Sequence, residues 1–274
     1  MTTPLHPFRD QVSIVVSSYD GFFDAWRPFA FFLRKFWSSC PFPVYLITNE
    51  LAVRSTSLRQ IRVGRDRGWA SNMQTALEQI STSHLLYLQE DYFLTRPVDE
   101  GQLASDFTFA LENDAASFCF FDLALLGHEF TPRNGRFDLV PVESKGRTRL
   151  QTTLWKRDTL RSLLRPGEDA WQMEARGSDR TRDLRMFSYG PNELSPIPYL
   201  MSGLVRGLWT KEALAHCRAH GFSLRPRVRL QFRPGKVQQR WRRAVGRVTL
   251  PIMRSLQGGV IDLDAPASVW PPQY

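Results

Sequence analysis

Short apolar segments, many of them rich in β-branched residues, alternate with amphipathic helical segments through the first 120 residues of the chain. The segments that have the length and composition of buried strands are 12–19, 43–49, 61–64, 84–93 and 115–121. Residues 69–80 and 102–112 are expected helices, and a further helix with Pro28 in its first turn is expected after the first strand. Strands and helices that alternate in this way predict an α/β fold with a mostly parallel central sheet, covered by helices on both faces.

Polar residues follow three of the expected strands. These pairs are Tyr19-Asp20, Asn49-Glu50 and Glu90-Asp91. Ligands of open α/β sheets bind beyond the carboxyl ends of the strands, where a crevice opens. The three polar strand ends therefore predict one ligand site at this edge of the sheet.

The segment Gln89-Glu90-Asp91-Tyr92 combines two adjacent carboxylates with the end of an apolar strand. Carboxylate oxygens suit Mg²⁺ or Mn²⁺, which bind through one or two carboxylates together with phosphate oxygens of a substrate. Such an ion would neutralise charge on a departing diphosphate. The alternative is structural: Glu90 caps the following turn and Asp91 pairs with a neighbouring arginine.

In the order of its motifs the chain resembles nucleotide-sugar-dependent glycosyltransferases with the GT-A fold, of the type that builds bacterial polysaccharides and lipopolysaccharides. The resemblance covers roughly residues 10–210, and the residues that carry it are Ser18–Asp20, Gly68–Met73, Leu85–Phe93, Leu154–Arg157, Glu168–Glu174 and Gly177–Ser178. It implies a GT-A-like, Rossmann-like sheet and a hexosyltransferase-like enzyme. That enzyme would move a sugar from a nucleotide-diphosphate donor to a glycan acceptor, either lipid-linked or part of a cell-surface polysaccharide.

The resemblance also implies roles for individual residues on the donor side. Tyr19 and Asp20 would contact the nucleoside, and Asn49 and Asn72 would lie near the ribose or diphosphate. Arg65 would pair with phosphate oxygens, which suit guanidinium geometry. Tyr19 as an ordinary sheet-edge aromatic and Asn72 as an ordinary residue at a helix start are the structural alternatives.

The metal motif departs from the family. An Asp-any-Asp triplet is usual there, whereas this chain has Gln89 at the first position. Asp91 and Glu90 are the expected ligands of Mn²⁺ or Mg²⁺; a site that uses Asp91 alone, or no metal, is the alternative. The missing acid also supports a second hypothesis, a non-catalytic scaffold at the membrane surface that binds a nucleotide or a glycan.

The second half of the chain holds the candidates for chemistry at the acceptor. An inverting transfer needs a base for the acceptor hydroxyl. The candidates are Glu168, Asp169 and Glu174, of which Glu174 or Asp169 is the expected base. Asp91 is the other expected catalytic residue, through the metal that it would hold. Trp171 offers a flat apolar platform for a sugar face, and Arg180 is a candidate diphosphate contact. The alternatives are that Asp169 begins a helix and that Arg180 forms an ion pair.

The net charge of +9 comes from one region near the C-terminus. Residues 222–261 contain ten of the 36 basic residues and no acidic one, which leaves 26 basic against 27 acidic residues elsewhere. We therefore divide the chain into a transferase domain, residues 10–221, and a basic extension, residues 222–274. Within the extension, residues 233–256 have the pattern of an amphipathic helix that binds an anionic membrane surface.

The basic extension has two alternative roles. We do not expect nucleic acid as a partner, because no recognised binding module accompanies the arginines. The alternative to membrane binding is that the apolar stripe packs on the body or on a second subunit of a homodimer. The chain has three cysteines without a Cys-x-x-Cys pair, no apolar run of about 20 residues and no leader-like start. These features predict a cytoplasmic protein that associates peripherally with the inner membrane.

Overall fold

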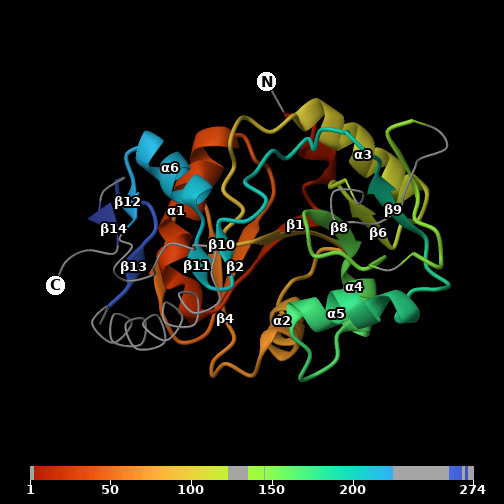
Figure 1. Cartoon of the computed structure of the whole chain (residues 1–274), viewed down its shortest axis with the longest axis horizontal. Helices are drawn as coiled ribbons and strands as arrows, with labels where there is room; N and C mark the ends of the chain where they lie inside the picture. Colours follow the sequence, from red (N-terminus) through yellow and green to blue (C-terminus); the bar gives the residue numbers. More distant parts are fainter. Residues whose placement is uncertain (1–2, 123–134, 145, 225–258, 267–268, 271–274) are drawn as a thin grey trace.

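The structure is a computed structural model of the 274-residue chain, and it describes residues 3–122, 135–144, 146–224, 259–266 and 269–270. Its centre is an eight-stranded sheet (Figure 1). In spatial order the strands of this sheet are β4 (Arg59–Arg62), β2 (Val44–Thr48), β1 (Val12–Ser17), β5 (His84–Gln89), β8 (Thr153–Lys156), β6 (Ser117–Cys119), β9 (Met186–Tyr189) and β7 (Phe137–Leu139). The described helices are α1 (Phe23–Phe36), α2 (Trp69–Leu77), α3 (Glu100–Glu112), α4 (Arg157–Leu163), α5 (Ala170–Gly177) and α6 (Lys211–Ala219).

The sheet is mixed but mostly parallel. Strands β4, β2, β1 and β5 pair in parallel, whereas β8 runs antiparallel to both β5 and β6. Strand β9 is parallel to β6, and β7 closes the edge as an antiparallel neighbour of β9. The predicted α/β class is confirmed, and the antiparallel strands β7 and β8 are what the first half of the sequence did not indicate.

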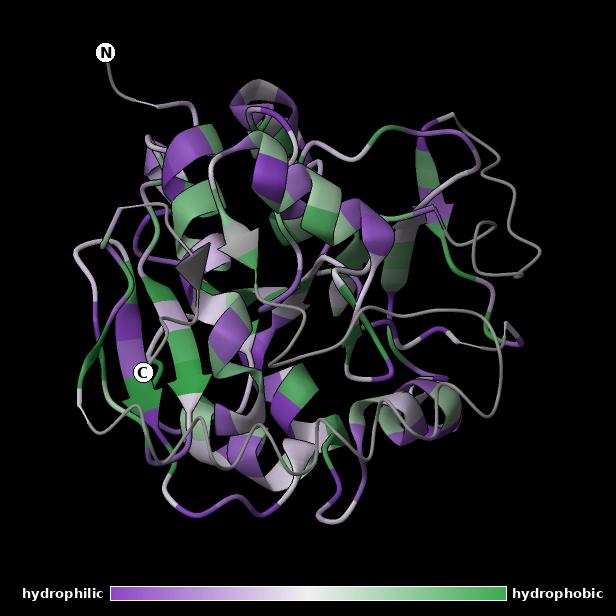
Figure 2. Ribbon diagram, turned by 60° about the vertical axis from the view of Figure 1, so that its left-hand side comes forward, coloured by the Kyte–Doolittle hydropathy of each residue, from purple (hydrophilic) through white to green (hydrophobic). Residues whose placement is uncertain are grey.

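Helices cover both faces of the sheet, as the alternation of strands and helices predicted. In β1, Ile14 and Val16 join the core beneath α1 and α3, whereas Val15 joins the core beneath α2, α4 and α5. Figure 1 shows α3 on one side of the sheet and α2, α4 and α5 on the other. Figure 2 colours the helix ribbons in both purple and green, as expected of helices with one apolar face.

Some predicted boundaries were wrong. Strand β5 ends at Gln89 rather than at residue 93, because the Tyr92 N–H donates to the carbonyl of Gln89 (3.1 Å) and closes a turn. Helix α1 begins at Phe23, after a 3₁₀ turn at Asp20–Phe22, so Pro28 lies inside the helix rather than in its first turn. The early turn after β5 places Glu90 and Asp91 at the very end of the strand.

Short strands outside the main sheet join distant parts of the chain. They are β3 (Val53–Arg54), β10 (Leu204–Val205), β11 (Leu208–Trp209), β12 (Ser223–Leu224), β13 (Ile261–Asp262) and β14 (Val269–Trp270). Strand β13 pairs in parallel with β3, and Arg34 on α1 forms an ion pair with Asp264 (2.6 Å). Residues 259–266 of the predicted extension therefore pack on the body. The predicted amphipathic helix, residues 233–256, lies outside the described residues, and none of the described helices is long and apolar enough to span a membrane.

A buried carboxylate on α3, beside β9, is expected to make stability depend on pH. Asp106 on α3 is fully buried; its carboxylate accepts hydrogen bonds from Tyr189 and Gln102 and pairs with Arg136. Burial raises the pKa of Asp106 from 3.8 to about 6, despite these three partners. In the folded protein this group therefore holds its proton more tightly than in the unfolded chain.

We expect the stability that this proton contributes to be present below about pH 4 and lost as the pH rises through 6. A pKa rise of this size corresponds to about 3 kcal/mol. The free energy of unfolding of the wild type, minus that of Asp106→Asn, should therefore fall by up to about 3 kcal/mol between pH 3.5 and pH 7. Urea denaturation at a series of pH values measures this difference, and a difference that does not change with pH would contradict the expectation.

Candidate functional site

A cavity of about 450 Å³ opens at the carboxyl ends of β1 and β5. The chain passes from β1 to β2 on one side, while β5 pairs with β1 on the other side, so the cavity lies at the point where the strand order reverses. Ligands of open α/β sheets bind at such points. Of the predicted site residues, those that line this cavity are Tyr19, Asn72, Glu90, Asp91, Asp169 and Trp171.

The end of β1 contributes an aromatic side chain. Tyr19 is 39% exposed and packs edge-on against Phe22, with the ring centroids 4.7 Å apart. A Cβ atom at Gly21 would lie 2.4 Å from the Tyr19 ring, so glycine at this position allows the ring to fold back over the turn. A partly exposed ring at the mouth of the cavity is suited to stacking on a planar ligand group.

Asp20 and Asn49, by contrast, connect two strand ends and do not line the cavity. The carboxylate of Asp20 accepts the backbone N–H groups of Asn49 (2.8 Å), Glu50 (2.9 Å) and Leu51 (2.9 Å). The Asn49 side-chain oxygen in turn accepts the N–H of Asp20 (3.1 Å), and both side chains are buried. The pair fastens the turn after β1 to the turn after β2.

The end of β5 supplies two buried carboxylates, Glu90 and Asp91, to the cavity. Oδ2 of Asp91 accepts the backbone N–H of Leu204 (2.8 Å), at the start of the β10–β11 hairpin. A Cβ atom at Gly203 would lie 2.8 Å from the backbone oxygen of Asp91, so the hairpin approaches as closely as glycine permits. Asp91 thereby positions a hairpin that is distant in the sequence.

The tip of that hairpin brings a cation to the cavity. Arg206 and Gly207 both have positive φ values, 53° and 74°, as in the type I′ turn that joins two short antiparallel strands. Glycine adopts this conformation readily, whereas arginine rarely does. Both residues line the cavity, so backbone strain coincides with the candidate site.

The N-terminus of α2 forms another wall. Gly68 precedes the helix with φ 87°, and its N–H donates to Oδ1 of Asp66 (2.9 Å). The Asn72 side chain donates to the same oxygen (2.8 Å) and accepts the N–H of Arg67 (3.2 Å). Asn72 therefore holds the loop that leads into α2, while the exposed Arg65 does not line the cavity.

The start of α5 closes the cavity from the second half of the chain. Asp169 is the N-cap of this helix and forms a capping box with Gln172, in which Oδ1 of Asp169 accepts the N–H of Gln172 (2.7 Å). The second oxygen of Asp169 has no hydrogen bond among the described residues. Trp171 follows in the first turn with 80% of its surface exposed.

Two other predicted residues of this region lie away from the cavity. Arg180 forms a bidentate pair with Glu168 and donates to the carbonyl of Leu163 (2.8 Å); this pairing lowers the pKa of Glu168. Glu174 lines a neighbouring cavity instead, where its Oε1 accepts the N–H of Leu150 (2.8 Å). Burial raises the pKa of Glu174.

Sequence reasoning missed several residues that line the cavity or shape it. Ser17 accepts the indole N–H of Trp69 (3.0 Å), and Asp66 holds the Asn72 loop. Tyr87 is fully buried, and its hydroxyl has no hydrogen-bond partner in the described structure. The position of Asp66, two residues before the glycine that caps α2, could have indicated that Asp66 binds the helix start. Tyr87 could not be distinguished from the other residues of an apolar strand by its sequence.

The carboxylates at the end of β5 fit a shared metal site. Among the described residues no group of three or more His, Cys, Asp or Glu side chains is arranged to hold a metal ion. A Mg²⁺ or Mn²⁺ ion held by one or two carboxylates plus the phosphates of a ligand does not need such a group. Glu90 and Asp91 therefore suit a metal that arrives with a diphosphate. The pair His216 and His220 lies elsewhere, against Phe32, where His216 Nε2 lies 3.0 Å from the carbonyl oxygen of Leu94.

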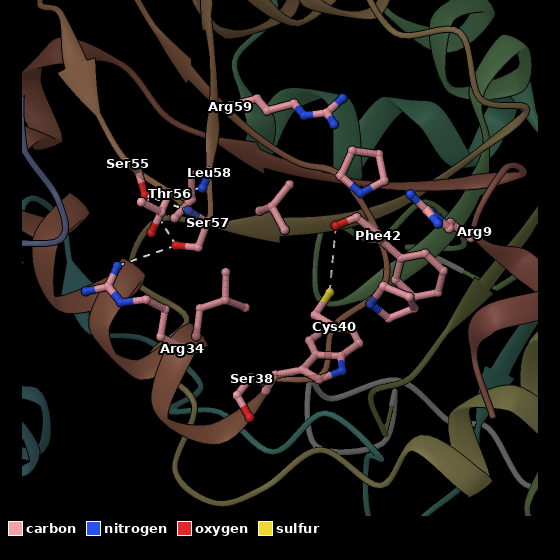
Figure 3. A pocket seen from close by; sticks show the side chains of 15 residues that line it. Arg9, Arg34, Ser38, Cys40, Phe42, Ser55, Thr56, Ser57, Leu58 and Arg59 are labelled. Atoms are coloured by element: carbon pink, nitrogen blue, oxygen red, sulfur yellow. Dashed lines mark hydrogen bonds between the residues drawn. The ribbon is translucent and has the colours of Figure 1, made fainter. Parts of the chain in front are cut away.

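Another cavity, of about 440 Å³, lies near the amino ends of β2 and β4 (Figure 3). It is lined by Arg9, Arg34, Arg59 and several serines, and by Phe42 and Cys40. Arg34 is already paired with Asp264, and it also lies 3.4 Å from the hydroxyl of Ser57. None of the predicted site residues reaches this cavity, which is at the opposite end of the strands from the candidate site.

Comparison with known proteins shows no family for this chain. No protein-family model matches the chain, and no curated protein matches it in sequence. Similar solved structures include residues 1–349 of S. aureus TarS (12% identity, TM-score 0.45, 69% of this chain and 59% of that chain). A CMP-2-keto-3-deoxy-manno-octonic acid synthetase complexed with CTP matches at 11% identity and a TM-score of 0.45, over 77% of this chain and 98% of that chain. The galactosyltransferase LgtC in complex with donor and acceptor sugar analogues matches at 12% identity and a TM-score of 0.34, over 64% of this chain and 66% of that chain. The chain thus spans about three fifths of the TarS fragment. These similarities carry no conclusion about the activity of this chain.

Proposed function

We propose that the protein is a glycosyltransferase that moves a sugar from a nucleotide-diphosphate donor to a glycan acceptor. The observation that carries the proposal is the gathering of Tyr19, Asn72, Glu90, Asp91 and Asp169 around one cavity at the switch point of the sheet. These residues come from separate segments of the chain. Together they supply an aromatic surface, acidic oxygens and a positioned carboxylate, which are the groups that transfer of a nucleotide sugar needs.

On the donor side, each wall of the cavity suits one part of the ligand. Tyr19 offers its ring to the nucleoside, and the N-terminus of α2, behind Gly68, offers backbone N–H groups to phosphate oxygens. Arg206 at the hairpin tip adds a cation. Glu90 and Asp91 would hold Mn²⁺ or Mg²⁺ together with the diphosphate, and the ion would supply Lewis-acid stabilisation of the leaving group.

On the acceptor side, Asp169 is the base that we favour over Glu174. Asp169 lines the donor cavity, its capping box fixes its orientation, and Oδ2 makes no hydrogen bond among the described residues. In the proposed inverting step the acceptor oxygen bonds to the anomeric carbon as the bond to the diphosphate breaks, and its proton passes to Asp169. The transition state is expected to resemble an oxocarbenium ion, as in glycoside hydrolysis.

We further propose that the acceptor is a lipid-linked glycan at the cytoplasmic face of the inner membrane. The support is electrostatic: ten basic residues and no acidic residue occur between positions 222 and 261. Each basic residue near an anionic membrane surface contributes about 1 kcal/mol of attraction. Such a region would bring the enzyme to its acceptor; a homodimer that buries the apolar stripe of the same region is the competing arrangement.

The proposal is tested first by thermal melting with UDP, GDP, TDP and CMP, each with and without Mn²⁺. A ligand that binds only the folded state at about 100 times its Kd stabilises it by about 2.7 kcal/mol, which should raise Tm by roughly 5 °C. We expect one nucleoside diphosphate to raise Tm, more strongly with Mn²⁺. If none of them raises Tm, the transferase proposal fails.

The second candidate function is a non-catalytic scaffold that binds a nucleotide or glycan. Gln89, where the family usually has an acid, is the observation that favours it. The two functions are separated by incubating the protein with radiolabelled nucleotide sugars whose base is the one that raises Tm. Release of the nucleotide or labelling of an acceptor supports the enzyme, whereas nucleotide binding without any turnover supports the scaffold.

A further inference from the structure

The neighbouring cavity that Glu174 lines has a volume of about 500 Å³ and adjoins the candidate site on the far side of Trp171. We call it the second cavity; it is distinct from the cavity in Figure 3. Trp171 lines both cavities and is the most exposed large apolar side chain among the described residues. An indole that is 80% exposed gains little from packing within its own chain, so its position between two cavities points to contact with a ligand. Exposed tryptophan faces are suited to the apolar face of a sugar ring.

One face of α5 and the turn after it forms the floor of this second cavity. The residues of this face follow the helical pattern i, i+3, i+4 and i+7, and they are Trp171, Glu174, Ala175 and Ser178. The wall is the segment that precedes β8, and this segment crosses over α5. The residues of this segment that line the cavity include Glu143, Ser144, Gly146 and Arg149.

Hydrogen bonds join the segment before β8, which is the wall of the cavity, to α5 and the turn after it, which are its floor. The Ser178 hydroxyl accepts the N–H groups of Gly146 (2.9 Å) and Arg147 (3.0 Å), and Thr148 donates to the carbonyl of Glu174 (3.1 Å). A Cβ atom at Gly177 would lie 2.5 Å from the Thr148 hydroxyl, so the crossing is as close as glycine allows. The cavity is therefore preformed in the described structure, as binding sites for small ligands usually are.

The polar groups of the cavity suit a ligand rich in hydroxyls. Glu174 is mostly buried and uses one carboxylate oxygen for the N–H of Leu150. Arg149 is 9% exposed, and its Nε and Nη2 have no hydrogen-bond partner among the described residues. A buried donor without an acceptor is costly, and a ligand oxygen that reached this guanidinium would gain a charge-assisted hydrogen bond.

The charges of the cavity argue against an anionic ligand. Its described lining contains three carboxylates, Glu143, Glu174 and Asp179, and two guanidinium groups, Arg149 and Arg182, for a formal sum of −1. Arg182 is already paired with Glu143 at the rim (3.0 Å). A neutral ligand that both donates and accepts hydrogen bonds fits these walls better than a phosphate or a uronate.

We propose that this second cavity binds a neutral pyranose unit of the acceptor, stacked on Trp171 and hydrogen-bonded to Glu174 and Arg149. The inference rests on the proposed transferase function, because Trp171 borders the donor cavity and follows the proposed base Asp169 by two residues. A sugar on Trp171 would present a hydroxyl to Asp169 at the boundary between the cavities. Glu174 is then a residue of the acceptor site and not the base.

The test blocks the cavity without touching the donor site. Ala175 is exposed on α5 and lines only the second cavity, so in Ala175→Trp the new side chain fills the space while the helix stays intact. The matched control is Arg176→Trp, which places the same side chain at the next exposed position, outside the cavity lining. Glu174→Gln keeps the acceptor for the Leu150 N–H and removes the charge.

Binding is measured with methyl glucoside, galactoside, mannoside and N-acetylglucosaminide as probes. Acrylamide quenching of tryptophan fluorescence reports on exposed indoles. Trp171→Phe, made in the wild type and in each variant, identifies the contribution of Trp171 apart from that of the introduced indole. We expect at least one probe to protect Trp171 in the wild type, with an apparent Kd that rises more than about tenfold in Ala175→Trp and changes less than about twofold in Arg176→Trp. Glu174→Gln should weaken binding by about threefold to tenfold.

The nucleotide melts are run on the same variants. A nucleotide-induced rise in Tm that is equal in the wild type and in Ala175→Trp, beside lost sugar binding in Ala175→Trp, supports the second cavity as the acceptor site. The inference is overturned if no probe protects Trp171, or if Ala175→Trp binds the probes as the wild type does. Absence of any nucleotide effect on Tm refutes the transferase function instead, whichever result the sugars give.

Discussion

In Asp91→Asn we expect transfer of the sugar to fall by about 100- to 1,000-fold while the fold is retained. Removing one group that stabilises developing charge in a water-excluded site typically has an effect of this size. The asparagine oxygen can still accept the N–H of Leu204, so the hairpin with Arg206 should stay in place. The loss would then reflect the missing negative charge and the metal that it helps to hold. Initial rates at saturating donor, with and without Mn²⁺, measure the effect.

Asp10→Asn is the control for Asp91→Asn, since Asp10 is exposed, does not line the cavity and precedes the amino end of β1, whereas the cavity lies at the carboxyl end. Both variants should melt within about 2 °C of the wild type. We also expect the additional rise in Tm that Mn²⁺ gives with the nucleotide to disappear in Asp91→Asn alone. Full activity in Asp91→Asn would contradict the assignment of Asp91 to the diphosphate site.

Asp20→Ala should have the opposite profile, with a large loss of stability. The Asp20 carboxylate is buried and accepts three backbone N–H groups at the end of β2. Alanine would leave these donors without an acceptor, and each unsatisfied buried group costs about 1–3 kcal/mol. We expect the free energy of unfolding to fall by about 3–5 kcal/mol, as measured by urea denaturation.

The exposed carboxylate Asp10 again provides the comparison. Asp10→Ala should change the free energy of unfolding by less than about 0.5 kcal/mol. A stable Asp20→Ala protein that has lost only nucleotide binding would show that Asp20 contacts the nucleoside after all. Loss of stability together with retained nucleotide binding in the remaining folded fraction would establish the structural role.

Much of the lining of the candidate site could be predicted from the sequence because strand ends are local features. The segment 84–93 is apolar at its start and acidic towards its end, so it predicts a strand with Glu90-Asp91 near its carboxyl end, although the predicted strand was too long. The same reasoning applies to Tyr19 after β1 and to Asn72 at the start of α2. Parallel strands bring their carboxyl ends to one edge, so these residues gather there whatever the rest of the chain does.

The roles of Asp20, Arg180 and Glu174 could not be predicted in this way. Their partners are the turn after β2, Glu168 and the N–H of Leu150, respectively. A carboxylate or guanidinium has the same composition signal whether it meets a ligand or its own chain. Only the neighbours in space decide whether such a group contacts a ligand or its own chain, and the spacing of residues along the sequence predicts none of these pairings.

The sequence by itself therefore determined the α/β class, the two covered faces of the sheet and the edge of the sheet at which the candidate site lies. These follow from hydrophobic periodicity, a local property that sets which side of each strand and helix is buried. The tertiary structure decided the rest. Asp91 accepts a hydrogen bond from the hairpin that carries Arg206, Asp20 accepts backbone N–H groups after β2, and Trp171 lies between two cavities. The physical reason is that hydrogen bonds and cavity walls join segments far apart in the chain, 113 residues in the case of Asp91 and Leu204, and such contacts exist only once the strands have been ordered into a sheet.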